Sequence, residues 1–284
     1  MTDLVATHHQ QHVLPYYQRL GSRLGYAALL NRTRHFGWYE PTHSPWRFTA
    51  AMRRMEVVVA RRLALPPGSA VLDAGCGVGD VARTVARVSG AQVTGIDGIA
   101  SDVGIARHRS ARADGPGTRT RFLTADYHAL PFADASYDGV YTMESCVHSP
   151  DPQRVLTELH RVLRPGGRLV MCEYSSTPTD HLAPGARSAL NRVCALSAMP
   201  GMLALTHGEL DRLLRRTGFT LDSAFDATEK ILPMLRAFAV LGRLPYSLAC
   251  RVNREDSLVN AMSGVEMYRH QDAWRYVITV ATKP

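Results

Sequence analysis

Between residues 70 and 173, short apolar runs alternate with segments of helical periodicity, and this alternation restricts the fold more than any other feature of the chain. Ala70–Ala74 and Ala91–Ile96 are short apolar runs, and Arg119–Thr124, Gly139–Thr142 and Arg168–Glu173 are predicted as further strands. Runs this short and this apolar, separated by helices, are typical of a parallel sheet that is covered on both faces. We therefore expect an α/β fold, with a sixth strand over Phe219–Phe225 and a last strand over Trp274–Ala281.

The first apolar run leads directly into a glycine-rich turn, Asp73-Ala74-Gly75-Cys76-Gly77-Val78-Gly79-Asp80. Glycine accepts positive φ angles and lets the backbone approach a ligand closely. The turn is not the dinucleotide fingerprint Gly-x-Gly-x-x-Gly, because Asp80 occupies the position of its third glycine. The carboxylate of Asp73, at the end of the predicted strand, suits a cationic ligand better than a pyrophosphate.

Two more acidic residues follow predicted strands. Asp97 ends the second run, where a carboxylate can accept hydrogen bonds from both hydroxyls of a ribose, and Asp126 follows the third run, within reach of an adenine amine. A single aspartate at such a position is usually a helix cap or a solvated loop residue. Because the carboxyl ends of parallel strands meet at one edge of the sheet, we expect Asp73, Asp97 and Asp126 to line one crevice.

In combination, these segments resemble the class I S-adenosylmethionine (SAM)-dependent methyltransferases. The likeness covers about residues 68–175, and its matching pieces are Val71–Gly79, Gly95–Asp97, Ala125-Asp126, Leu130–Phe132, Tyr137-Asp138 and Leu163–Gly167. It implies a Rossmann-like seven-stranded sheet whose last strand is antiparallel, with SAM as the cofactor. It also implies that Asp73, with the Gly75 and Gly77 backbone, holds the methionine part of SAM.

The same resemblance assigns the rest of the cofactor site. Asp97 is implied to bind the ribose, and Asp126 with Tyr127 to meet the adenine. The implied cofactor-binding residues also include Ala74, Gly98, Ile99, Ala125 and Met143.

Three regions are expected around this core. Residues 1–65 form an N-terminal helical cap, with helices over Leu14–Leu30 and Phe48–Leu65. Residues 66–178 form the SAM-binding core. Residues 179–284 supply helical substrate-binding insertions and the last strands, and the apolar stretch Ile231–Cys250, between strands six and seven, is expected to form a lid.

Further segments resemble the sterol C-methyltransferases and related C-methylating enzymes of isoprenoid metabolism. They are His35–Glu40, Met143–Pro150 and the C-terminal run from Gly264. The likeness implies methyl transfer to an alkene of a prenyl group in a small natural product, through a carbocation that is later deprotonated or cyclised. Such a site needs apolar walls, aromatic faces that stabilise the cation, and a base.

Three residues are candidates for catalysis. We expect Glu144 and His148 at the mouth of the fourth strand beside the methyl group, where either orients the substrate or accepts its proton. Tyr17 comes from an N-terminal stretch rich in aromatic residues. In the alternative interpretations, Glu144 bonds only SAM or backbone, His148 is structural, and the aromatic residues pack in the core or on a neighbouring subunit.

Other functions are weighed against this one. An O- or N-methyltransferase of small molecules would need only a general base, which His148 could supply. The net charge of +8 permits RNA methylation, but no run of five basic residues occurs, so we expect no nucleic-acid partner. A SAM-binding regulator without activity also stays open. We expect a small hydrophobic substrate, prenylated or terpenoid, and leave a homo-oligomer open.

Cysteine and apolar patterning indicate the compartment. The five cysteines lie far apart without a Cys-x-x-Cys pair, which indicates neither a zinc site nor a disulfide framework and favours a cytoplasmic protein. No apolar stretch of about 18 residues occurs, so no membrane insertion is expected. His8, His9 and His12 have metal-like spacing but lack a second cluster, so no metal is expected.

Overall fold

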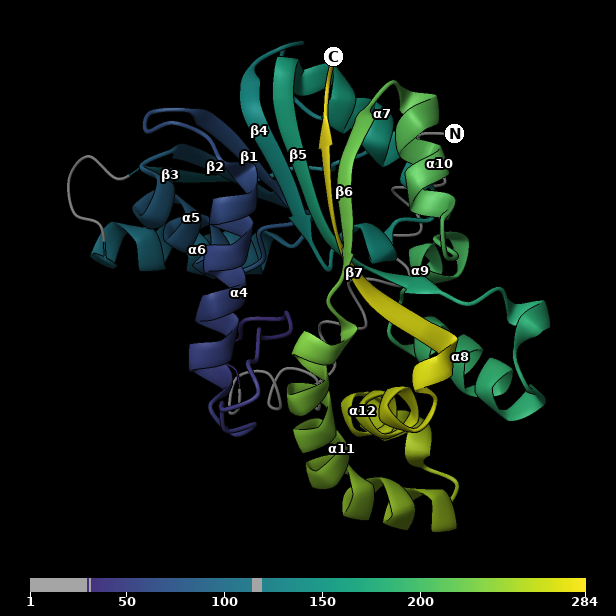
Figure 1. Ribbon diagram of the computed structural model, residues 1–284. Helices are drawn as coiled ribbons and strands as arrows, with labels where there is room; N and C mark the ends of the chain where they lie inside the picture. The colour runs from purple at the N-terminus through teal and green to yellow at the C-terminus, as the bar shows by residue number, and fades with distance from the viewer. Residues whose placement is uncertain (1–29, 31, 114–118) are drawn as a thin grey trace.

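The computed structural model describes residues 30, 32–113 and 119–284, and a seven-stranded sheet runs through its centre (Figure 1). The strands are β1 (Ala70–Ala74), β2 (Gln92–Asp97), β3 (Thr120–Thr124), β4 (Tyr137–Met143), β5 (Leu163–Ser176), β6 (Thr220–Asp226) and β7 (Trp274–Thr282). Their order in the sheet is β3-β2-β1-β4-β5-β7-β6. The first five strands pair in parallel, and β7 is antiparallel to both β5 and β6. The predicted Rossmann-like sheet with an antiparallel last strand is confirmed.

Helices cover both faces of this sheet, and a further group lies beyond the carboxyl ends of its strands (Figure 1). They are α4 (Phe48–Leu63), α5 (Asp80–Ser89), α6 (Ala100–Ala113), α7 (Pro152–Val162), α8 (Pro184–Leu196), α9 (Pro200–Ala204), α10 (Glu209–Thr217), α11 (Thr228–Arg251) and α12 (Val259–Arg269). Successive strand residues point to opposite faces, so Val71 packs in the core beneath α4 and α5 while Leu72 packs in the core beneath α7 and α10. Burial on both faces explains why the parallel strands are visible in the sequence as continuous apolar runs.

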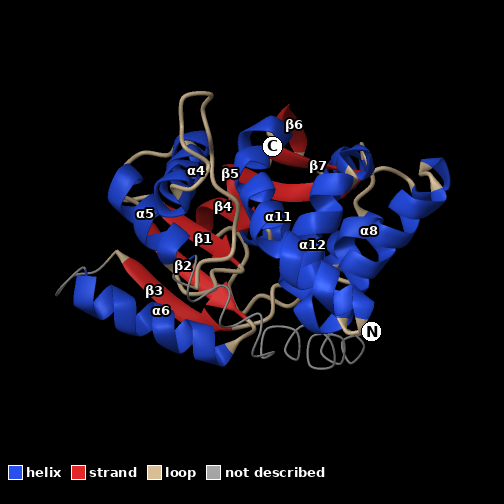
Figure 2. Ribbon diagram, turned by 90° about the horizontal axis from the view of Figure 1, so that it is seen from below, coloured by secondary structure: helices blue, strands red, loops and turns tan. Residues whose placement is uncertain are grey.

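The helices α8, α11 and α12 lie together beyond the carboxyl ends of β4 and β5 (Figure 1), and Figure 2 shows the same group from below. The sequence pattern predicts helical, apolar structure over Leu232–Met267, and this stretch is divided in two, because α11 ends before α12 begins. The expected lid, Ile231–Cys250, lies wholly within α11. Asn253 has a φ of 52° and Arg254 N–H donates to the Ala249 carbonyl at 2.9 Å. This left-handed residue and its backward hydrogen bond form a helix stop that asparagine tolerates well.

Two sequence predictions lie outside the described residues. They are the helix over Leu14–Leu30, except for Leu30 itself, with the candidate Tyr17, and the histidines His8, His9 and His12. Among the residues that are described, no helix has both the length and the apolar character that crossing a bilayer requires.

Candidate functional site

A cavity of about 110 Å³ opens at the carboxyl ends of β1, β2 and β4. The sequence-predicted residues that line it are Asp73, Gly75, Gly77, Asp97, Gly98, Ile99, Tyr127, Met143, Glu144 and His148. Parallel strands that end at one edge of the sheet bring these side chains together, as expected from their order along the chain. Ala74, Ala125 and Asp126 are not among the residues that line this cavity.

The glycine-rich turn forms one wall of this cavity. Gly75 has a φ of 105°, and a Cβ atom there would lie 2.3 Å from the Cβ of Ser145. Gly77 has a φ of 50°, and a Cβ there would meet no atom within 4 Å, so the space beside it is open to a ligand. Both backbone conformations favour glycine, and both keep the wall of the cavity free of side chains.

Asp97 fixes this turn to the end of β2. Its carboxylate accepts hydrogen bonds from the backbone N–H groups of Gly77 at 2.9 Å and Ile99 at 2.8 Å. Burial raises its pKa above the ordinary value, and the two N–H donors oppose that shift. The carboxylate therefore organises the turn and also borders the cavity.

Asp73 lies at the end of β1, 1% exposed, and accepts a hydrogen bond from the Tyr141 hydroxyl at 2.7 Å. Burial, with a smaller contribution from the nearby Asp97 carboxylate, raises the pKa of Asp73 to about 7 against the opposing effects of Tyr141 and His35. Two buried acids in one cavity are stabilised in their ionised form when a cation binds between them. The two carboxylates, which accept hydrogen bonds and attract positive charge, therefore fit a cationic ligand with a ribose. SAM has both features.

Asp126 has a different environment. Its side chain is about half exposed, and Oδ1 accepts from the backbone N–H of His128 at 2.8 Å. The same oxygen lies 2.7 Å from the His128 ring, whose other nitrogen lies 2.7 Å from the Ser149 hydroxyl. Tyr127, by contrast, lines the cavity and donates its hydroxyl to the Ser145 carbonyl at 3.2 Å.

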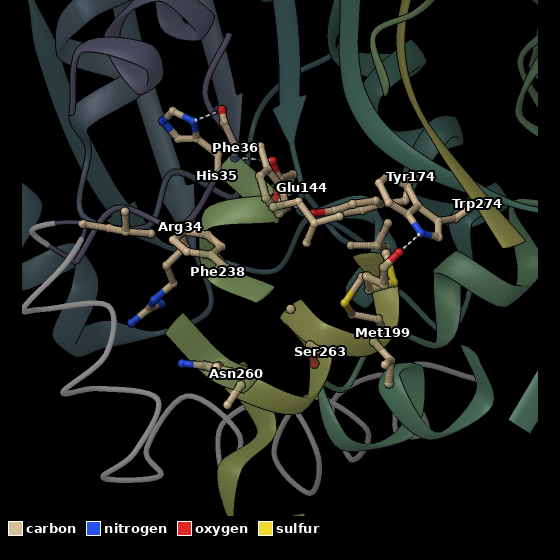
Figure 3. A pocket seen from close by; sticks show the side chains of 18 of the residues that line it. Arg34, His35, Phe36, Glu144, Tyr174, Met199, Phe238, Asn260, Ser263 and Trp274 are labelled. Carbon is tan, nitrogen blue, oxygen red and sulfur yellow. Dashed lines mark hydrogen bonds between the residues drawn. The ribbon is translucent and has the colours of Figure 1, made fainter. Parts of the chain in front are cut away.

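A second cavity of about 320 Å³ adjoins the first and is bordered by α8, α11, α12 and the segment that precedes α4 (Figure 3). The two cavities share the lining residues Arg34, His35, Glu144 and His148. Apart from these four, Asn260 and Ser263, the larger cavity is lined by apolar and aromatic residues: Leu30, Phe36, Val147, Tyr174, Val193, Met199, Leu235, Phe238, Leu241, Gly242, Pro245, Ala261, Gly264, Met267 and Trp274. A hydrophobic ligand there would lie directly beside the acid-lined cavity.

Glu144 stands at the junction of the two cavities. Its φ of 53° is unusual for a residue other than glycine and turns the chain as it leaves β4. Oε1 accepts from Phe36 N–H at 2.7 Å and from the Tyr276 hydroxyl at 2.9 Å, and Oε2 accepts from the Tyr174 hydroxyl at 2.9 Å. Burial raises the pKa of Glu144, and the Phe36 N–H is the largest opposing influence. The carboxylate thus anchors three aromatic residues, of which Phe36 and Tyr174 are labelled in Figure 3.

His148 borders both cavities from a short 3₁₀ turn, Cys146–His148. Its Nδ1 lies 2.7 Å from the Ala198 carbonyl. Because a carbonyl only accepts, Nδ1 carries the proton in this arrangement, and Nε2 of the neutral ring is then the basic atom.

Two functional side chains carry no signal in the sequence pattern. Glu173 accepts hydrogen bonds from the N–H groups of Cys146 at 3.0 Å and of Ser145 and Val147 at 3.3 Å, and burial raises its pKa to about 7. It holds the turn that carries His148. His35 lies 3.6 Å from the Glu56 carboxylate; burial opposes its charge, but Glu56, the Phe36 carbonyl and Glu144 together outweigh burial and raise its pKa. Both are recognised only from contacts between distant parts of the chain.

Comparison with known proteins agrees with this geometry. Residues 72–171 match the family described as "Methyltransferase domain". The S-adenosyl-L-methionine-dependent Diels-Alderase iccD of Talaromyces variabilis is 34% identical over 97% of this chain and 96% of its own. The O-methyltransferase cnsE of Penicillium expansum is 35% identical over 73% of this chain and 72% of its own.

Among solved structures, the [4+2]-cyclase SpnF superposes with a TM-score of 0.73 at 26% identity, over 94% of this chain and 96% of its own. The likeness extends over the helical regions as well as the sheet, because nearly the whole of each chain is covered. With the sheet order and the acid-lined cavity, these comparisons show that the chain belongs to the class I SAM-dependent methyltransferases of secondary metabolism, enzymes whose cofactor is SAM.

Proposed function

We propose that this enzyme transfers the methyl group of SAM to an alkene carbon of a prenylated or terpenoid small molecule bound in the larger cavity. One observation carries the proposal: an apolar and aromatic cavity of about 320 Å³ adjoins the acid-lined cavity and shares Glu144 and His148 with it. An apolar acceptor has few groups that can form hydrogen bonds, so its position depends on the shape of the cavity that surrounds it.

SAM supplies an electrophilic methyl group on a sulfonium. For its binding we propose that Asp73 and the Gly75 and Gly77 backbone hold the methionine part. Asp97, with Gly98 and Ile99, holds the ribose. Tyr127 meets the adenine, and Asp126, with Ala125, contributes to adenine binding from the surface side of the same loop. Ala74 supports the turn, since its carbonyl accepts from the Ser145 hydroxyl at 2.6 Å.

In the proposed reaction, the π electrons of the alkene would form the new carbon–carbon bond as the sulfur–methyl bond of SAM breaks. S-adenosylhomocysteine would be the leaving group, and the positive charge would move to the neighbouring carbon of the acceptor. Phe36, Tyr174 and Trp274 border the cavity there, and the faces of aromatic rings stabilise a cation. Loss of a proton restores an alkene, or attack by a second alkene closes a ring. Glu144 holds the aromatic wall in place, and His148 accepts the proton at Nε2.

The affinity for SAM should depend on pH through Asp73. Because the pKa of Asp73 is raised to about 7, the carboxyl group is protonated below that pH and must lose its proton when a cation binds beside it. We expect the dissociation constant to be lowest above pH 7 and to rise by about tenfold for each pH unit below it. Calorimetry in two buffers of different ionisation enthalpy measures the released proton, and Asp73→Asn should remove the dependence. If the dissociation constant stayed within about threefold of one value from pH 5 to 8, that result would argue against this role of Asp73.

Substitution of His148 should alter the final step. We expect His148→Ala to slow product formation by about tenfold and to change the ratio of products, because water must then take the proton. Single-turnover kinetics with product analysis measures both quantities. Val88→Ala serves as the control, since the Val88 side chain is exposed on α5 and lines neither cavity. An unchanged rate with unchanged products would leave His148 with a structural role only.

A second candidate function is an intramolecular [4+2] cyclisation in which SAM is bound but not consumed. The likeness to the Diels-Alderase iccD over 97% of the chain favours it. Methylation of an oxygen or nitrogen is the nearest alternative among transferases. Counting S-adenosylhomocysteine released per molecule of product, across prenylated and polyene acceptors, separates the candidates: one equivalent supports methyl transfer, and none, with turnover of the acceptor, supports cyclisation.

A further inference from the structure

The second half of α11 exposes a row of large aliphatic side chains. Val240 is 58% exposed, Leu244 69%, Leu248 51% and Val252 66%, with Leu241 beside them at 46%. Helical residues four apart lie on one side of the helix, so the four form a continuous stripe. We call these five residues the α11 stripe. Figure 1 shows this part of α11 at the lower edge of the molecule, away from the sheet.

Arginines border the α11 stripe. Arg236, Arg243 and Arg251 are exposed, and at 100° per residue they fall within about 60° of Val240 around the helix axis. The exposed Arg254 follows the end of the helix. No acidic residue occurs in the sequence between Glu229 and Glu255. The surface is therefore apolar along one side and positively charged along the next.

The α11 stripe is continuous with the larger cavity. Leu241 belongs to the stripe and also lines the cavity, together with Gly242 and Pro245 from the same turn of helix. An apolar molecule that leaves a lipid phase at the stripe would meet this lining without first crossing water.

We propose that the α11 stripe docks on an anionic membrane surface and that the apolar acceptor enters the larger cavity from there. The account of the acceptor rests on the proposed function, whereas the docking rests on the stripe alone. An interfacial helix buries its apolar side at the level of the acyl chains while arginines beside it contact anionic head groups. Docking of this kind needs no spanning helix.

Charge decides between a membrane and a second copy of the chain. If two copies paired through the α11 stripe by two-fold symmetry, the arginines of one copy would lie against the arginines or the apolar side chains of the other. This part of the helix carries no acidic residue that could form ion pairs with them. Like charges brought together in an interface oppose association. An anionic surface complements the same row.

Vesicle co-sedimentation of the full-length protein tests the docking. We expect binding to equimolar phosphatidylglycerol and phosphatidylcholine that is at least about tenfold stronger than binding to phosphatidylcholine alone and that weakens with salt. Leu244→Glu with Leu248→Glu should reduce binding by at least about tenfold. The control is Val88→Glu, which adds one of the two negative charges at a valine 45% exposed on α5 and should bind as the wild type does.

Cys250 provides a second readout, because it is exposed while the other four cysteines are buried. A polarity-sensitive fluorophore on Cys250 should shift to shorter wavelength with the anionic vesicles, and not with the neutral ones.

Three results would overturn the docking. They are equal vesicle binding by the double variant and the wild type, no binding of the wild type, and a wild-type dimer in sedimentation velocity that the double variant dissociates without vesicles playing any part. Vesicle binding can be measured without any methyl transfer, so the two proposals are tested independently. Loss of docking with intact C-methylation would thus contradict this proposal alone, and docking without C-methylation would contradict only the proposed function.

Discussion

Replacing Asp97 with alanine is expected to weaken SAM binding by about two to four orders of magnitude. The buried carboxylate holds the glycine-rich turn through the N–H groups of Gly77 at 2.9 Å and Ile99 at 2.8 Å. Hydrogen bonds to a charged group contribute about 1.5–3 kcal/mol each, so loss of both is worth about 3–6 kcal/mol. The same oxygens are the proposed ribose acceptors, and both effects act in the same direction.

Calorimetric titration with S-adenosylhomocysteine measures this loss. The matched control is Asp138→Ala, because Asp138 also accepts a backbone N–H, that of Ala70 at 2.8 Å, but at the opposite end of the sheet. We expect the control to keep its affinity, and thermal unfolding of both variants to show that they are folded. If folded Asp97→Ala protein bound the ligand within about threefold of the wild type, the proposed cofactor site would be wrong.

Replacing Glu144 with glutamine is expected to slow methyl transfer by about a hundredfold while leaving the affinity for SAM nearly unchanged. Glu144 accepts three hydrogen bonds, from Phe36 N–H and the hydroxyls of Tyr174 and Tyr276. The amide nitrogen of glutamine cannot accept, so at least one buried donor loses its partner at a cost of about 1–3 kcal/mol. The aromatic wall then shifts relative to the methyl group.

Single-turnover kinetics across pH separates anchoring from proton transfer at Glu144. If the residue acts as an anchor, the pH profile of Glu144→Gln keeps its shape at a lower rate, and Tyr276→Phe, which removes one donor and leaves the carboxylate, slows the reaction by a smaller factor. Loss of one limb of the profile would instead make Glu144 the base. A wild-type rate in Glu144→Gln would contradict both roles.

The sequence was sufficient for the sheet and for one wall of the cofactor cavity. The central strand Ala70–Ala74 is buried on both faces, so it is apolar except for Asp73 near its end and is easily recognised. Asp73 and Asp97 were predictable as neighbours because the strands that they end pair in parallel, with Asp73 opposite Gly95. Once the strand order is known, the position of a residue at the end of a strand therefore predicts which other residues lie beside it in space.

The larger cavity could not be predicted from the sequence pattern. Its shape depends on how α8, α11 and α12 pack against one another, and helical periodicity gives only the side that each helix buries. Glu144 was identified as a candidate, but its partners Phe36 and Tyr276 lie 108 and 132 residues away. No local pattern contains such contacts. The break between α11 and α12 was missed because an asparagine stop is a weaker signal than glycine or proline.

The central claim is that the methyl group of SAM becomes bonded to a carbon of an apolar acceptor held in the larger cavity. The most direct measurement is the fate of an isotope-labelled methyl carbon, followed by nuclear magnetic resonance and mass spectrometry of the product from a prenylated acceptor. The account predicts that the label appears on carbon, at a former alkene position, with one S-adenosylhomocysteine released for each product molecule. Label on oxygen or nitrogen, or an acceptor that cyclises without taking up the label, would contradict it.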